Sequence, residues 1–278
     1  MGILGHEGNV SLDGNTFYAS SAGGQTLTAV DITNPVVPVL LWTTTRYSVH
    51  GLNVSDDGNR VYFADLGKAG LTILDTSQIQ RRVSNPTVPE VSHLTWPVVS
   101  IPQVPIPVVI KGHRYLVEID EYNKNLGSYN PASAVGAARM IDLADDKHPR
   151  VISDIRLQVN QPANRAGPQQ YDTGATFLVQ GYAGHYCAVP SRVDPGIVAC
   201  SFIMSGMRVF DIHDPYHPRE IAYANFPTGS TSPTEAASAF VMCAPAFVPD
   251  RNEVWFADGN SGFYNVRLTN GIWRHNAA

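Results

Sequence analysis

Three histidines and one cysteine fall at similar places in a repeated sequence pattern, and these residue types can bind a transition metal. His6 and His50 each lie seven residues before the aspartate of an Asp-Gly turn. Cys243 has the same spacing from the aspartate of a later turn, and His185 lies nine residues before another. Imidazole nitrogen and thiolate sulfur are ligands for copper, iron and zinc, and the carboxylate of Glu7 could join them or orient them.

The elements that would position these residues are copies of a unit that repeats every 44 residues. Its Asp-Gly turn occurs as Ser-Leu-Asp-Gly at 11–14 and as Ser-Asp-Asp-Gly at 55–58. Its apolar strand occurs as Leu-Thr-Ala-Val-Asp at 27–31 and as Leu-Thr-Ile-Leu-Asp at 71–75. This period is typical of a β-propeller blade, whose first strand lines the central channel. The four candidate ligands would therefore meet near the propeller axis.

Composition and repeats together predict an all-β protein, a single β-propeller domain over residues 1–278. The chain has 23 Gly and 20 Pro with only 15% charged residues, which favours many short strands over long surface helices. We expect about five four-stranded blades, at 3–46, 47–91, 98–158, 181–226 and 239–270. Long connections are expected at 84–107, 121–137, 160–180 and 227–238, and the loops at the channel mouth would form the contact surface.

A structural alternative competes with the metal site. Polar residues at inner strand ends commonly hydrogen-bond to neighbouring blades, and the third copy has Val104 at the corresponding place, which interrupts the set of ligands. The chain also lacks the sequence motifs of serine hydrolases, zinc proteases, phosphate-binding loops and dinucleotide-binding folds. The sequence thus favours a non-catalytic protein, with a metal-binding or metalloenzyme propeller as the alternative.

Charge and hydropathy exclude two classes of partner. The formal net charge is −5, so there is no basic field for a nucleic-acid backbone. No apolar run reaches the roughly 18 residues of a membrane-spanning helix. The partner would be a protein or a small molecule bound on one face of the propeller.

Two cysteines flank a short segment that contains a Pro-Gly turn. Cys187 and Cys200 would face each other across the resulting hairpin, which predicts a disulfide between them. The alternative is a pair of buried free thiols in adjacent strands, with Cys243 as a third.

Two segments resemble a known repeat. The sequence Gly-Leu-Thr-Ile-Leu-Asp at 70–75 and the sequence Gly-Met-Arg-Val-Phe-Asp-Ile-His-Asp-Pro-Tyr-His-Pro at 206–218 are similar to the LVIVD repeat of bacterial β-propeller proteins. The resemblance implies an exported protein, located in the periplasm, the cell envelope or outside the cell, without an assigned activity. It further implies that the chain is the C-terminal portion of a longer, seven-bladed member whose export signal lies upstream. The expected function is a non-catalytic interaction or scaffold module.

Overall fold

The chain folds into five antiparallel sheets. The computed structural model describes residues 5–96, 101–121, 137–157, 183–226, 239–269 and 271–273. In this part of the chain four sheets have four strands and the fifth has three, and within each sheet the strands follow one another in sequence order. The predicted all-β fold with five blades is confirmed. The predicted loops at 160–180 and 227–238, and all but the two end residues of the predicted insertion at 121–137, lie outside the described residues.

The strand bounds show how regularly the unit repeats. The first sheet contains β1 (Glu7–Val10), β2 (Thr16–Ser21), β3 (Thr26–Asp31) and β4 (Val39–Thr44). The second contains β5 (Val49–Val54), β6 (Arg60–Asp65), β7 (Gly70–Asp75) and β8 (Glu90–Thr95), with the short helix α1 (Ser77–Gln80) before β8. The third contains β9 (Ile101–Ile110), β10 (His113–Glu121), β11 (Ala138–Asp142) and β12 (Arg150–Ile155). The fourth contains β13 (Cys187–Ala188), β14 (Ile197–Ser201), β15 (Met207–Asp211) and β16 (Arg219–Ala224). The fifth contains β17 (Ala246–Val248), β18 (Glu253–Asp258) and β19 (Gly262–Arg267), with the 3-10 helix η3 (Pro249–Arg251) between the first two.

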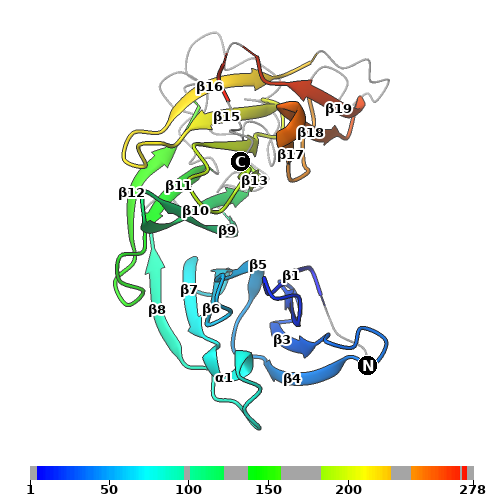
Figure 1. Ribbon diagram of the computed structural model, residues 1–278, viewed down its shortest axis with the longest axis vertical. Helices are drawn as coiled ribbons and strands as arrows, with labels where there is room; N and C mark the ends of the chain where they lie inside the picture. Colours follow the sequence, from blue (N-terminus) through cyan, green and yellow to red (C-terminus); the bar gives the residue numbers. More distant parts are fainter. Residues whose placement is uncertain are drawn as a thin grey trace.

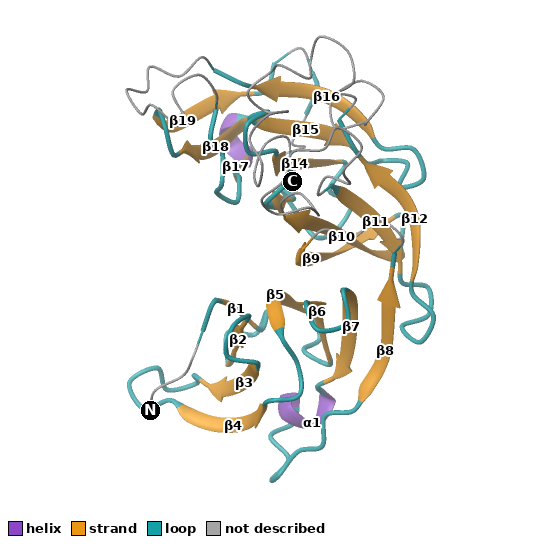
Figure 2. Cartoon of the chain, turned by 180° about the vertical axis from the view of Figure 1, so that it is seen from behind, coloured by secondary structure: helices purple, strands orange, loops and turns teal. Residues whose placement is uncertain are grey.

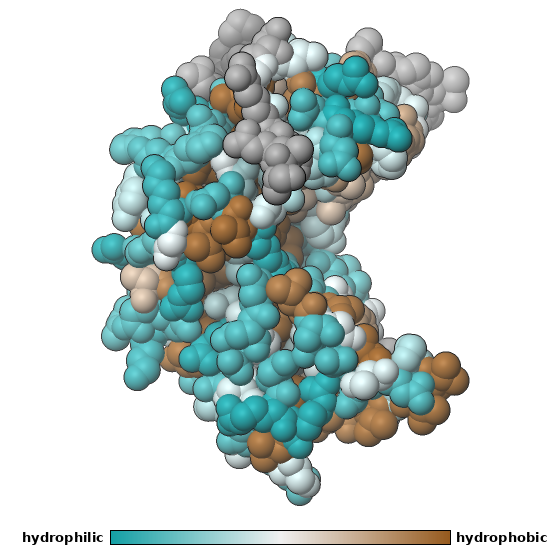
Figure 3. Space-filling model, in the orientation of Figure 1, coloured by the Kyte–Doolittle hydropathy of each residue, from teal (hydrophilic) through white to brown (hydrophobic). Residues whose placement is uncertain are grey.

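The five sheets follow one another along an open arc (Figure 1). The first strands of the sheets lie on the concave side, and β4, β8, β12 and β16 lie on the convex side, as the view from behind also shows (Figure 2). β1 contacts β5, and β5 contacts β9. The molecule is hollowed on the side where the arc opens (Figure 3). The inner strands therefore face a common axis, as the site hypothesis requires. In the described part of the chain, no helix is long and apolar enough to cross a membrane.

The repeated turn explains why the blades form where they do. In the first copy Ser11 Oγ donates a hydrogen bond to Asp13 Oδ1 at 2.6 Å, and Gly14 has a φ of +74°. The same side-chain bond forms between Ser55 and Asp57, 44 residues later. Glycine adopts this left-handed conformation without the steric cost of a Cβ atom, so the Asp-Gly pair fixes the hairpin.

Each neighbouring pair of sheets is joined by its own hydrophobic cluster. Between the first and second sheets Leu27 packs with Leu52, and both are almost completely buried. Leu71 and Leu116 belong to the cluster between the second and third sheets, and similar clusters join the third to the fourth and the fourth to the fifth. Burial of one such leucine side chain contributes about 1.5–3 kcal/mol, so the interfaces between the sheets hold the arc together.

The second and third sheets extend into a segment that the sequence predicted to be a loop. The predicted connection at 84–107 contains β8 and most of β9, and the predicted second blade, 47–91, ends inside β8. The sequence predicted a loop here because the segment contains Pro102, Pro105 and Pro107, and all three lie in β9. β9 pairs only with β10 in its sheet. An edge strand tolerates proline because the missing N–H removes no hydrogen bond from the sheet interior.

Candidate metal site

The structure brings the three predicted histidines to the inner ends of the sheets. His6 directly precedes β1, His50 lies on β5, and His185 lies two residues before β13. The rings of His6 and His50 lie next to each other, with 5.0 Å between their centroids. His50 is 5% exposed. His6, Glu7 and His50 also form a group whose potential ligand atoms all lie within 4.8 Å of one another.

A carboxylate that the sequence did not single out connects the second and third histidines. Glu121, the last residue of β10, places Oε2 3.4 Å from Nε2 of His50 and Oε1 3.1 Å from Nε2 of His185. These residues come from three different sheets. The sequence offered only a weak signal, because Glu121 ends an acidic strand and was assigned to the predicted insertion.

Backbone carbonyls fix the orientation of both imidazoles. His50 Nδ1 bonds to the carbonyl oxygen of Pro102 at 2.9 Å, and His185 Nδ1 bonds to that of Met242. A carbonyl oxygen can only accept, so each Nδ1 carries a hydrogen. In a neutral imidazole the other nitrogen, Nε2, then carries the lone pair. Both histidines therefore direct an Nε2 atom at the same carboxylate, Glu121.

The surroundings of His50 favour its neutral form. Burial lowers the pKa of His50, and this effect outweighs the hydrogen bond to Pro102 and the charges of Glu121 and Glu7, which act in the opposite direction. A neutral His50 presents a lone pair to Glu121, and two acceptor atoms facing each other repel. A cation between them would remove that repulsion.

Glu7 has a different set of partners in the same region. Its Oε1 atom accepts hydrogen bonds from Gln103 Nε2 and from the Tyr186 hydroxyl, both at 2.6 Å. Burial, followed by the hydrogen bond to Glu7, raises the pKa of Tyr186, so this hydroxyl stays protonated and donates. Glu7 is thus held beside the histidines by residues from the third sheet and from the segment before β13.

The structure does not bring Cys243 into the histidine group. Cys243 Sγ accepts a hydrogen bond from the backbone N–H of Ala257 on β18 at 3.0 Å. Burial raises the pKa of its thiol, which disfavours the thiolate that a metal requires. Sequence spacing suggested Cys243 because it marks the same repeat position, yet the fifth sheet turns this side chain toward its own second strand.

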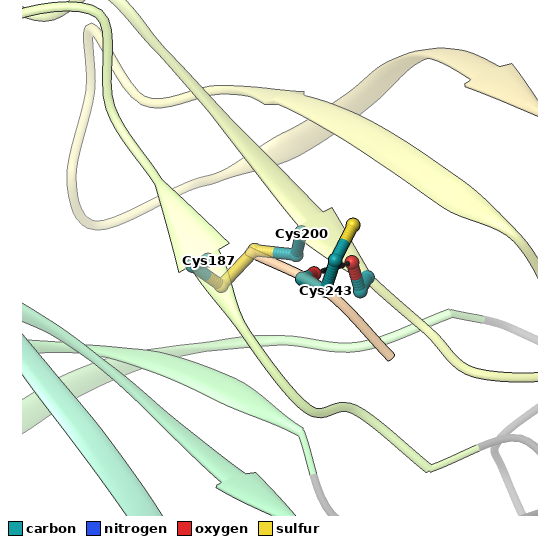
Figure 4. Close-up of a disulfide and its surroundings, with 4 residues drawn as sticks. Cys187, Cys200 and Cys243 are labelled. Carbon is teal, nitrogen blue, oxygen red and sulfur yellow. Dashed lines mark hydrogen bonds between the residues drawn. A yellow bond between two sulfur atoms is a disulfide. The ribbon is translucent and has the colours of Figure 1, made fainter. Parts of the chain in front are cut away.

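The disulfide predicted between Cys187 and Cys200 is confirmed, with 2.05 Å between the sulfur atoms. The two residues are direct partners in the register of β13 and β14. Figure 4 shows Cys243 near the disulfide with its sulfur directed away from it. Because β13 has only two residues, the disulfide holds the start of the fourth sheet, and with it the segment that carries His185 and Tyr186.

Comparisons with known proteins support the fold. No family model and no curated protein sequence matches the chain. Among solved structures, a periplasmic gluconolactonase of Pseudomonas aeruginosa superposes with a TM-score of 0.61 at 13% identity, over 96% of this chain and 67% of that one. The Swd1 β-propeller domain of Myceliophteria thermophila superposes with a TM-score of 0.55 at 13% identity, over 92% and 68%. A putative 6-phosphogluconolactonase of Bacteroides fragilis also gives 0.55 at 13%, over 96% and 67%.

These identities are too low to carry an activity from one protein to the other. What the superpositions share with the present structure is the arrangement of consecutive antiparallel sheets around an axis. The chain is therefore similar to these proteins in fold alone, and that fold is the β-propeller.

Proposed function

We propose that the chain binds one divalent transition-metal ion at the inner ends of its sheets, through His50, Glu121 and His185. The observation that carries the proposal is the orientation of two imidazoles, each with Nδ1 held by a backbone carbonyl and Nε2 facing one shared carboxylate. In known metal sites, the ring nitrogen that does not bind the metal donates a hydrogen bond, and this bond fixes the orientation and the tautomer of the imidazole. His6, whose ring lies 5.0 Å from that of His50, would be a further ligand or would shield the site.

Each histidine–carboxylate distance is close to that between two ligands of one metal, since two atoms that lie about 2.1 Å from a tetrahedral metal are separated by about 3.4 Å. Nε2 of His50 lies 3.4 Å from Oε2 of Glu121, and Nε2 of His185 lies 3.1 Å from Oε1, so one ion between the rings would use both carboxylate oxygens. The ligand atoms that all lie within 4.8 Å of one another belong to a different group, His6, Glu7 and His50. Two imidazoles and a carboxylate are a ligand set for zinc, copper or iron, whereas magnesium and calcium prefer oxygen alone.

The competing explanation is a purely structural ion pair, with protons on the histidines in place of a metal. The two explanations differ in metal content. We expect metal-free protein, prepared with a chelator, to take up one equivalent of Zn²⁺ in a competition titration against a chromophoric chelator. His50→Ala should weaken the affinity by more than about 100-fold, since it removes a direct ligand.

The matched control is His213→Ala, because His213 also pairs with a carboxylate but lies in an exposed turn. This control should bind Zn²⁺ like the wild type. Circular dichroism melts would show that both variants are folded. An absence of saturable metal uptake, or equal affinities for the wild type and His50→Ala, would reject the metal site and leave the ion pair.

We further propose that the chain is an exported interaction module of the LVIVD type. The disulfide supports export, because such bonds persist in oxidising compartments. Apolar side chains exposed in the turn between β3 and β4 support an interaction role, since Val36 and Val37 are 85% and 62% exposed. Figure 3 shows apolar surface at the lower right, at the end of the arc where Figure 1 labels β4. Thiol counting by mass spectrometry on protein from its natural host should find one free cysteine of three. Three free thiols would reject export.

A further inference from the structure

A cavity lies beside the candidate metal site. It has a volume of about 700 Å³ and is bounded by β1, β5, β9 and the segment around β13. This volume lies within the range of small-molecule sites, about 300–1,000 Å³. Its lining includes the apolar side chains of Leu52, Val104 and Ile106. An apolar body of ligand size would be well accommodated there.

The cavity lining includes a carboxylate that can accept hydrogen bonds. Glu7 lines the cavity, and its Oε1 atom already receives hydrogen bonds from Gln103 and Tyr186. A carboxylate has two acceptor oxygens, so the other oxygen of Glu7, Oε2, is the acceptor for a ligand with an O–H or N–H group.

The cavity offers no available positive charge in its described lining. Arg192 is the cation there, and its guanidinium is bound by the chain itself. Its terminal nitrogens donate to the carbonyl of Val54 at 2.8 Å, to Asp56 at 2.9 Å and to Asn53 at 2.9 Å. Asp56 thus balances its charge. An anionic ligand would lose its hydration without gaining a partner, which is costly in an apolar cavity.

We propose that this cavity binds a small uncharged molecule with an apolar body and, at one end, a hydroxyl or N–H group that donates to Glu7. The exclusion of anions follows from the cavity lining, which contains none of the three proposed metal ligands and so gives an anion no direct contact with the metal. The preference for a neutral ligand over a cationic one rests on the proposed metal, whose two positive charges would balance the carboxylates of Glu7 and Glu121.

Three probes with the same ring test the proposal: benzyl alcohol, benzoate and benzylamine. Isothermal titration of the zinc-loaded protein should show benzyl alcohol binding at least tenfold more tightly than either of the others. In metal-free protein the two carboxylates are unbalanced, so benzylamine should bind most tightly and benzoate should remain the weakest. Benzoate binding as tightly as the alcohol in either form, or no binding of any probe, would overturn the proposal.

A cavity-filling variant locates the binding. Ala188→Phe places a ring in the lining, and Val83→Phe adds the same ring at an exposed position outside it. Ala188→Phe should abolish probe binding, and Val83→Phe should leave it unchanged. Zinc content, measured separately, should match the wild type in both, so a failed metal site is distinguishable from a failed cavity site. Undiminished probe binding in a folded Ala188→Phe variant would place the ligand elsewhere and reject the proposal.

Discussion

Histidine–carboxylate pairs occur in two regions of this molecule, and the two regions use them differently. At the inner ends of the sheets, His50 and His185 approach Glu121 from separate sheets, and all three side chains are at least 88% buried. In the outer turns, His213 bonds to Asp211 at 2.8 Å and is 72% exposed. His148 and His217 form similar pairs within their own turns and are about four-fifths exposed.

The difference lies in how each pair is assembled. An outer pair joins residues two or three positions apart, so the turn alone creates it, and solvent screens it. An inner pair exists only because the fold brings distant strands together, and its members have lost their hydration. The same residue types therefore cap a turn in one region and form a candidate ligand set in the other. Variants in the two regions should differ accordingly.

The largest difference in stability is expected between alanine variants of two arginines, one buried and one exposed. Arg139, 1% exposed, donates to Glu118 and Asp120 and stacks 4.2 Å from the Trp96 ring. Arg139→Ala would leave buried carboxylates without their counter-charge and should lower the free energy of unfolding by about 3–5 kcal/mol.

Arg219→Ala is the control, because Arg219 pairs with Asp211 at the protein surface and is 74% exposed. It should cost less than about 1 kcal/mol. Urea denaturation of both variants measures the contrast. Equal losses would mean that burial does not distinguish the ion pairs of the interior from those of the surface turns.

Removal of the disulfide should cause the next largest loss of stability. Replacing Cys187 and Cys200 with Ser frees a segment of sequence separation 13 and should destabilise the protein by about 3 kcal/mol through unfolded-state entropy. It should also weaken metal binding, since the bond holds the segment that carries His185. Cys243→Ser is the matched control, and its melting temperature should stay close to that of the wild type. A double variant as stable as this control would contradict the assigned role.

These regions also show what the sequence could and could not predict. The blades and the disulfide were predictable because their determinants are local: an Asp-Gly turn, alternating apolar residues, and a hairpin closed within 13 positions. Glu121 was not predictable, because its contacts with His50 and His185 depend on how the sheets curve about the axis. The prolines of β9 concealed that strand, because proline reads as a loop signal unless the strand is known to be at an edge.

A smaller contrast is expected between two glycines. A Cβ atom on Gly51, on β5, would meet the carboxylate of Glu7 and would lie 2.5 Å from the carbonyl oxygen of Gln103. Gly51→Ala must therefore push β9 away and should cost about 1–3 kcal/mol. Gly23 lies in the exposed turn between β2 and β3 with open space around it, so Gly23→Ala should change stability by less than about 0.5 kcal/mol. Thermal melts that fail to separate the two variants would mean that the inner strands pack less closely than described.

The smallest effect should come from acid titration of an outer turn. Hydrogen bonds from the Ser11 hydroxyl and then from the Asn15 backbone lower the pKa of Asp13 from 3.8 to about 2. A carboxyl whose pKa is lower in the folded state than in the unfolded state stabilises the fold above the unfolded value, and this contribution disappears as pH falls from about 4 to about 2. Asp13→Asn removes the titrating carboxyl, so the free energy of unfolding of this variant should depend less on pH between about 2 and about 4. Above this range, its pH dependence should match that of the wild type. Ser11→Ala should also reduce the pH dependence of stability in this range, since it removes the main cause of the lowered pKa of Asp13. Because Asp13 is exposed, solvent screening keeps both effects modest, and an altered slope near neutral pH would show that another group is responsible.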